Sequence, residues 1–135
     1  MPDVFVDNDV IIDLFIRREP HHEAALRFFS HVKRAKGRCF TSPIVIANTY
    51  YLLAKMKNKR YAMDKIRRLR NLITITAVNE AIIDEVIQSP AKDFEDSIQY
   101  HCALQNKVHF FVSRNTVDYP KDKLKIVLPG EYLNM

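Results

Sequence analysis

Acidic and amide side chains that follow the first apolar run are the clearest chemical feature of this chain. The run Val4–Val6 leads into Asp7, Asn8 and Asp9, and Asp13 follows one helical turn later. Carboxylates held together in a partly dry site repel one another, so the cluster requires protonation or a neutralising cation. Because hard oxygen donors suit Mg²⁺ or Mn²⁺, the cluster predicts a divalent-metal site. A helix cap at Asp7 or Asn8 is the simpler alternative.

Short β runs and amphipathic helical patterns alternate along the chain and must position these side chains. β-Branched and aromatic residues predict five strands, at Val4–Asp7, Cys39–Ser42, Ile73–Thr76, Phe110–Ser113 and Lys125–Leu128. Periodicity and caps predict helices at Asn8–Arg18, His21–Lys36, from Pro43 onward, Tyr61–Asn71, Glu80–Gln88 and Asp93–Gln105. This order predicts an α/β fold with three α/β/α layers and a mainly parallel central sheet of four or five strands.

Finer predictions concern helix ends and helix faces. Gly37 is expected to close the second helix. The third helix is expected to turn one apolar face inward, formed by Ile44, Ala47, Tyr51 and Leu52. Tyr50 and Leu53 are candidates for an exposed groove that receives a partner peptide or a second copy of the chain, with core packing as the alternative.

Composition limits the class of protein. The 135 residues, 47% of them hydrophobic, suffice for one domain spanning residues 1–135 with a real core. Cys39 and Cys102 have apolar neighbours and no CxxC spacing, which predicts buried free thiols in a reducing cytoplasm. The chain has no apolar run of membrane-spanning length and no basic leader, so we expect neither membrane insertion nor secretion.

The net charge is +5 despite the acidic cluster, so basic residues must gather elsewhere. They form two groups, Lys33, Arg34, Lys36 and Arg38, and then Lys55, Lys57, Lys59, Arg60, Lys65, Arg67, Arg68 and Arg70. Such a density of cations suits a phosphate backbone and predicts a nucleic-acid partner. A solvated helix face is the alternative.

The predicted sheet limits which acids can meet. Ligands of parallel α/β sheets bind beyond the carboxyl ends of the strands. Asp7 follows the first strand, Asp96 lies in the first turns of the last long helix, and Asp118 lies in the loop after the fourth strand, so all three can face one crevice. Asp93 and Glu95 are interpreted as capping or rim groups, although periodicity alone does not select Asp96 over them.

Four segments resemble the motifs of the PIN-domain nucleases, a family whose bacterial members include VapC-type toxins. They are residues 6–13 (VDNDVIID), 41–48 (TSPIVIAN), 93–99 (DFEDSIQ) and 112–119 (VSRNTVDY), and residues 128–133 (LPGEYL) resemble the usual ending. The resemblance implies a metal-dependent endoribonuclease in which Asp7, Asp96 and Asp118 hold Mg²⁺ or Mn²⁺. It also implies an RNA substrate and, for a toxin-like member, an antitoxin partner.

Two positions depart from the family pattern. Asn48 stands where the second motif normally has Glu, and Asp9 stands where the first motif normally has Asn. We hypothesise that Asp9 restores the lost charge, so that Asp7, Asp9, Asp96 and Asp118 form the metal site. The alternative is that Asn48 marks a weakened or inactive member.

The fourth motif contributes further polar residues. Ser113 and Asn115 would orient the attacking water, a metal ligand or the scissile phosphate, and Arg114 would contact phosphate. Each is otherwise a loop residue that hydrogen-bonds its neighbours.

Two rival functions fit parts of the same pattern. The run Asp7-Asn8-Asp9-Val10 also resembles haloacid-dehalogenase-like phosphatases, with Asp7 as nucleophile, Asp9 as general acid and Thr41 as phosphate binder. The chain is short for that family and lacks its Gly-Asp-x-x-x-Asp motif. The non-enzymatic alternative is a basic RNA-binding module, whose salt-sensitive binding would not depend on Asp96.

Overall fold

A parallel sheet forms the centre of the protein in the computed structural model, which describes residues 1–89 and 93–135. Its strands are β1 (Val4–Val6), β2 (Cys39–Thr41), β3 (Thr74–Ile75), β4 (Phe110–Val112) and β5 (Lys125–Val127), arranged in the order β3-β2-β1-β4-β5. The helices are α1 (Asn8–Phe15), α2 (His21–Arg34), α3 (Pro43–Met56), α4 (Lys59–Arg70), α5 (Glu80–Gln88), α6 (Phe94–Gln105) and α7 (Pro129–Leu133).

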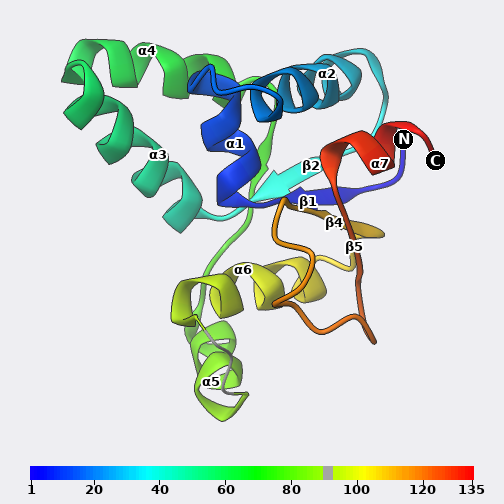
Figure 1. Cartoon of the computed structure of the whole chain (residues 1–135). Helices are drawn as coiled ribbons and strands as arrows, with labels where there is room; N and C mark the ends of the chain where they lie inside the picture. The colour runs from blue at the N-terminus through cyan, green and yellow to red at the C-terminus, as the bar shows by residue number, and fades with distance from the viewer. Residues whose placement is uncertain (90–92) are drawn as a thin grey trace.

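Helices cover both faces of the sheet, which confirms the predicted three-layer fold (Figure 1). Val4 and Val6 of β1 pack into the cluster that contains residues of α1, α2 and α7. Phe5 points to the opposite face and packs with residues of α5 and α6. This alternation follows from the two-residue period of a strand, and both faces are apolar because both are covered.

The chain path places a crevice beside β1. After β1 the chain builds β2 and β3 on one side, and it then crosses to build β4 on the other side. The Asp7 N–H donates to the Val112 carbonyl at 2.9 Å, and the Ser113 N–H donates to the Val127 carbonyl at 3.0 Å. Asp7 and Ser113 therefore lie at the carboxyl edge of adjacent strands, where ligands bind in this class of fold.

The predicted strands are confirmed to within one residue at every end, whereas several helix ends differ. Helix α1 ends at Phe15 instead of Arg18, α2 ends at Arg34 instead of Lys36, and α4 begins at Lys59 instead of Tyr61. Helix α7 was not predicted, because its five residues are too few for a periodic pattern. Helix α2 ends at Arg34, and Ala35 is already extended, so Gly37 does not close the helix. Gly37 instead has a φ of 136° in the loop, where its backbone lies against Met1 and leaves no room for a side chain.

Helix α3 buries a different face from the predicted one. Val45, Thr49 and Leu53 are buried, whereas Tyr51 is 70% exposed. The Thr49 hydroxyl donates to the Val45 carbonyl at 2.8 Å, which allows this polar side chain to be buried. Leu53 is 2% exposed, so its place in an exposed groove is wrong and its core-packing alternative is confirmed.

Both cysteines are buried free thiols, as predicted. In the described residues, we find no helix with the length and apolar character needed to span a membrane.

Candidate active site

The two carboxylate oxygens of Asp7 have different hydrogen-bond partners. Its Oδ1 accepts from the Asn8 N–H at 2.8 Å and caps α1. Its Oδ2 accepts from the Ser113 hydroxyl at 2.8 Å and from the Tyr119 hydroxyl at 2.7 Å. The side chain is only 4% exposed. The helix cap is therefore real, and it leaves the second oxygen for contacts across the crevice.

Ser113 joins Asp7 to Asp9. Its hydroxyl lies 2.8 Å from Asp7 Oδ2 and 3.3 Å from Asp9 Oδ2, and Asp9 also accepts from the Arg114 backbone N–H at 3.2 Å. The hydroxyl carries one proton and cannot donate fully to both carboxylates. The loop after β4 thus brings two predicted acids together from a position more than a hundred residues away in the chain.

Asp96 and Asp118 line a neighbouring cavity of about 530 Å³, together with Asp93 and Tyr119. Asp93 caps α6 by accepting from the Asp96 N–H at 2.9 Å, as predicted. The Asp118 N–H donates to Asn115 Oδ1 at 3.2 Å. Asn115 therefore shapes the loop that brings Asp118 to the cavity.

Tyr119 connects the two halves of the site and was missed in the sequence. Its hydroxyl donates to Asp7 Oδ2 at 2.7 Å, and it also opposes the rise in the pKa of Asp96 that burial causes. Its ring packs on Phe111, with centroids 4.6 Å apart, and stacks on Tyr100. An aromatic residue directly after Asp118 gives no signal beyond core packing, because the position of its hydroxyl depends on the loop.

The carboxylates of the site disfavour one another's ionised form. Burial, followed by the charge of Asp9, raises the pKa of Asp7 to about 7, against the opposing hydrogen bonds from Tyr119, Ser113 and Asn8. Burial also raises the pKa of Asp9, with a smaller contribution from Asp13 and opposition from Arg114. The pKa of Asp96 is raised by burial and then by the charges of Asp93, Glu95 and Asp9. Such a group of uncompensated acids is typical of a functional site.

Most of the chain matches a known protein family. A model of the PIN domain matches residues 3–117. The chain belongs to the PIN-domain family. Ribonuclease VapC1 of Aquifex aeolicus (strain VF5) is 28% identical over 124 residues, which cover 88% of this chain and 85% of that protein.

Solved structures share the fold of this PIN domain. Mycobacterium tuberculosis VapC20, described as a sarcin-ricin loop cleaving toxin, has a TM-score of 0.65 and 16% identity over 80% of this chain and 86% of its own. A toxin–antitoxin complex from Klebsiella pneumoniae has a TM-score of 0.68 and 18% identity over 93% of this chain and 97% of its own.

Asn48 of the second PIN motif contacts a residue that we had interpreted as a rim or capping group. Its Nδ2 donates a hydrogen bond to Glu95 Oε1. Asn48 lies on α3 and Glu95 in the first turn of α6, so the contact joins two elements across the carboxyl end of the sheet. Glu95 therefore points from α6 towards α3.

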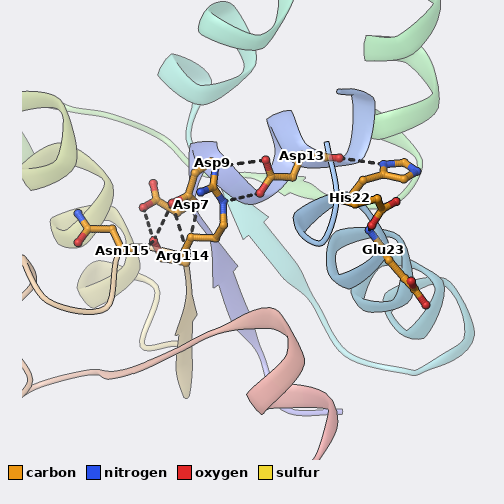
Figure 2. A network of polar contacts seen from close by, with 9 residues as sticks. Asp7, Asp9, Asp13, His22, Glu23, Arg114 and Asn115 are labelled. Carbon is orange, nitrogen blue, oxygen red and sulfur yellow. Dashed lines mark hydrogen bonds and ion pairs between the residues drawn. The ribbon is translucent and has the colours of Figure 1, made fainter. Parts of the chain in front are cut away.

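Arg114 and Thr41 both have hydrogen-bond partners within the protein. Arg114 binds Asp13 through two contacts, Nε to Oδ2 at 2.5 Å and Nη2 to Oδ1 at 3.2 Å (Figure 2). The Thr41 hydroxyl is fully buried and donates to the Val6 carbonyl at 3.0 Å. The phosphatase alternative thus loses its phosphate-binding residue.

The donor set suits a hard divalent cation, because it consists of carboxylate, amide and hydroxyl oxygens. The Oδ1 of Asn8, next to Asp7, is buried and accepts no hydrogen bond within the described residues. Among these residues, no three His, Cys, Asp or Glu side chains lie close enough to hold one ion in their present positions. The hydroxyls of Ser113 and Tyr119 lie between the carboxylates. The donors therefore fit Mg²⁺ or Mn²⁺ in chemistry. In their present positions, Asp7 and Asp9 accept hydrogen bonds from hydroxyl groups.

Proposed function

We propose that this PIN domain is a metal-dependent endoribonuclease and the toxin of a toxin–antitoxin pair. One observation carries the proposal. Asp7 and Asp9 share the Ser113 hydroxyl at the carboxyl edge of the sheet, and the charge of Asp9 raises the pKa of Asp7 and of Asp96, which comes from α6. Family membership and the similarity to a ribonuclease support the same reaction.

Asp7, Asp9, Asp96 and Asp118 are the residues that would hold Mg²⁺ or Mn²⁺. When bound, the ion supplies a water of lowered pKa and charge stabilisation at the attacked phosphoryl group. Ser113 keeps Asp7 and Asp9 adjacent through its hydroxyl. Asn115 holds the loop of Asp118 through its Oδ1. Ser113 and Asn115 thus act by positioning the acids. The nucleophile is water, so the reaction needs no side-chain nucleophile.

Cations near the site and on α4 would bind the RNA backbone. Lys123 lines the same cavity as Asp96 and Asp118, within reach of a phosphate there. The last turn of α4 carries Arg67, Arg68 and Arg70, all exposed. Exposed cations at this density attract phosphate and make binding sensitive to salt.

Cleavage of a labelled RNA tests the nuclease. We expect wild-type protein to cut RNA with Mg²⁺ or Mn²⁺ and to stop when EDTA is added. Asp96→Asn is expected to lose at least about 100-fold in rate, because it removes one charge from the metal site. Asp84→Asn is the matched control, since Asp84 is an exposed acid on α5. Salt-sensitive RNA binding without cleavage would instead support the RNA-binding module, and turnover of p-nitrophenyl phosphate without RNA cleavage would support the phosphatase.

An antitoxin would bind the α3–α4 hairpin. Exposed apolar side chains gather there, with Tyr51 at 70%, Met56 at 54% and Met63 at 41% exposure. In Figure 1 the hairpin lies on the opposite side of the sheet from α5 and α6. Light scattering of the purified chain, alone and with a candidate antitoxin, distinguishes this partner from a homodimer. We also propose a cytoplasmic location, which the two free thiols support.

A further inference from the structure

The pair formed by Asn48 and Glu95 brings an extra carboxylate to the acidic centre. Glu95 is half-buried and directly precedes Asp96. Its carboxylate is held by the amide of Asn48, which occupies the second-motif position on α3. The hydrogen bond therefore brings the Glu95 carboxylate to the α3 position where the second motif normally has its acid.

The direction of α6 supports this placement. Residues four apart lie on the same face of a helix, and Gln99 follows Glu95 by four positions. Gln99 is only 1% exposed, and neither atom of its amide group has a hydrogen-bond partner within the described residues. Glu95 thus begins a face of α6 that turns into the protein.

Only certain residue pairs can occupy positions 48 and 95. An amide N–H donates to a carboxylate and favours its ionised form. A second carboxylate at the same distance would repel the first and force one of them to take up a proton. The contact therefore explains why Asn stands at position 48 in a chain that has Glu at position 95.

We propose that Glu95 on α6 supplies the acidic group that the second PIN motif normally places on α3, and that Asn48 is the positioning residue that holds it. This inference rests on the proposed metal-dependent function. It differs from the hypothesis that Asp9 restores the charge, because Asp9 is bound by Ser113 and the Arg114 N–H while the hydrogen bond of Asn48 goes to Glu95.

Titration calorimetry with Mn²⁺ tests whether Glu95 replaces the acidic group of α3, and it does so without relying on RNA cleavage. Glu95→Gln is expected to weaken Mn²⁺ binding about 10–100-fold, the usual effect of losing a group that supports a metal site. The double variant Asn48→Glu/Glu95→Gln returns the carboxylate to α3 and is expected to recover most of that loss. Glu85→Gln, an exposed position on α5, is the matched control and should bind as wild type.

Each alternative result has a defined meaning. Unchanged Mn²⁺ affinity in a folded Glu95→Gln variant overturns the proposal, as does a double variant that binds no better than Glu95→Gln. A large loss in Asp9→Asn without one in Glu95→Gln would assign the compensation to Asp9. A wild-type protein that binds Mn²⁺ through Glu95 but cuts no RNA would refute the proposed nuclease alone. Thermal unfolding of every variant verifies that the fold is intact.

Discussion

Two buried carboxylates, six residues apart, have opposite surroundings in this protein. Asp13 is 1% exposed and meets the guanidinium of Arg114 through two contacts. Asp7 is 4% exposed and, within the described part of the chain, accepts from neutral donors only, while the Asp9 carboxylate raises its pKa further. Burial is therefore common to a structural and a candidate functional acid. The difference is that a cation compensates only the first charge directly.

The compensated acid supports the uncompensated ones. Arg114 binds Asp13 with its side chain and Asp9 with its backbone N–H (Figure 2). The ion pair thereby anchors the loop after β4 to α1, and this loop carries Ser113 and Asn115 to the site. The ion pair thus fixes the position of Ser113, whose hydroxyl contacts both Asp7 and Asp9.

Replacing the uncompensated charge should have the largest effect on activity. For Asp7→Asn we expect RNA cleavage to fall by at least about 10³-fold, or about 4 kcal/mol of barrier, because a proposed metal ligand loses its charge. The free energy of unfolding at pH 8 should not fall, since the substitution also removes a buried carboxylate that its neighbours repel. Cleavage rates and urea unfolding of the same preparation check both parts. A large loss of stability would show that Asp7 is mainly structural.

Replacing the compensated charge should reverse this pattern. Asp13→Asn is expected to lower the free energy of unfolding by about 3 kcal/mol, because it leaves the partly buried guanidinium of Arg114 unpaired. Urea unfolding gives the value. The double variant Asp13→Asn/Arg114→Met should recover part of the loss, since it removes both charges. If Asp13→Asn cost nothing, the proposed structural role of the pair would be wrong.

The sequence predicts one of these two environments better than the other. Asp7 could be placed because a short apolar strand and a capping position are local features. The partner of Asp13 could not, because Arg114 lies 101 residues away and its direction depends on the loop after β4. Charges that are compensated by distant residues cannot be distinguished from uncompensated charges by local pattern.

The rotation of a helix about its axis accounts for what could not be predicted at the start of α6 and on α3. The acids near the start of α6 were predicted, and periodicity did not show which of them faces α3. The same limit applies to α3, which is apolar on several sides because it contacts both α1 and α4, so its buried face had no unique pattern. Rotation of a helix about its axis is fixed by packing, which the residue pattern constrains only weakly.

The uncompensated charge should also give stability a characteristic pH dependence. The folded pKa of Asp7 is about 7, whereas the ordinary value is 3.8, so the native state binds the proton more tightly than the unfolded chain. Stability should therefore fall as the pH rises from about 4 to about 7 and level off above, by up to about 4 kcal/mol.

Urea unfolding in EDTA across this range measures the slope. Asp9 and Asp96, whose pKa values are also raised, contribute in the same direction, and Arg114 opposes the shift of Asp9. Asp7→Asn should flatten the curve in part, and Asp84→Asn, at an exposed acid on α5, should leave its shape unchanged. An equal slope in Asp7→Asn would contradict the assignment to Asp7.

The smallest expected effect comes from the hydroxyl of Tyr119. Tyr119→Phe removes a donor that favours ionised Asp7, so the pKa of Asp7 should rise further and the stability curve should level off at a higher pH. The loss of one hydrogen bond costs about 1 kcal/mol, while the ring contact with Phe111 remains. Tyr100→Phe is the matched control, because its hydroxyl donates to the Pro120 carbonyl and its loss should leave the pH at which the curve levels off unchanged. Carboxyl NMR of Asp7 in both variants measures the pKa directly, and equal values would mean that the Tyr119 hydroxyl does not control the unpaired charge.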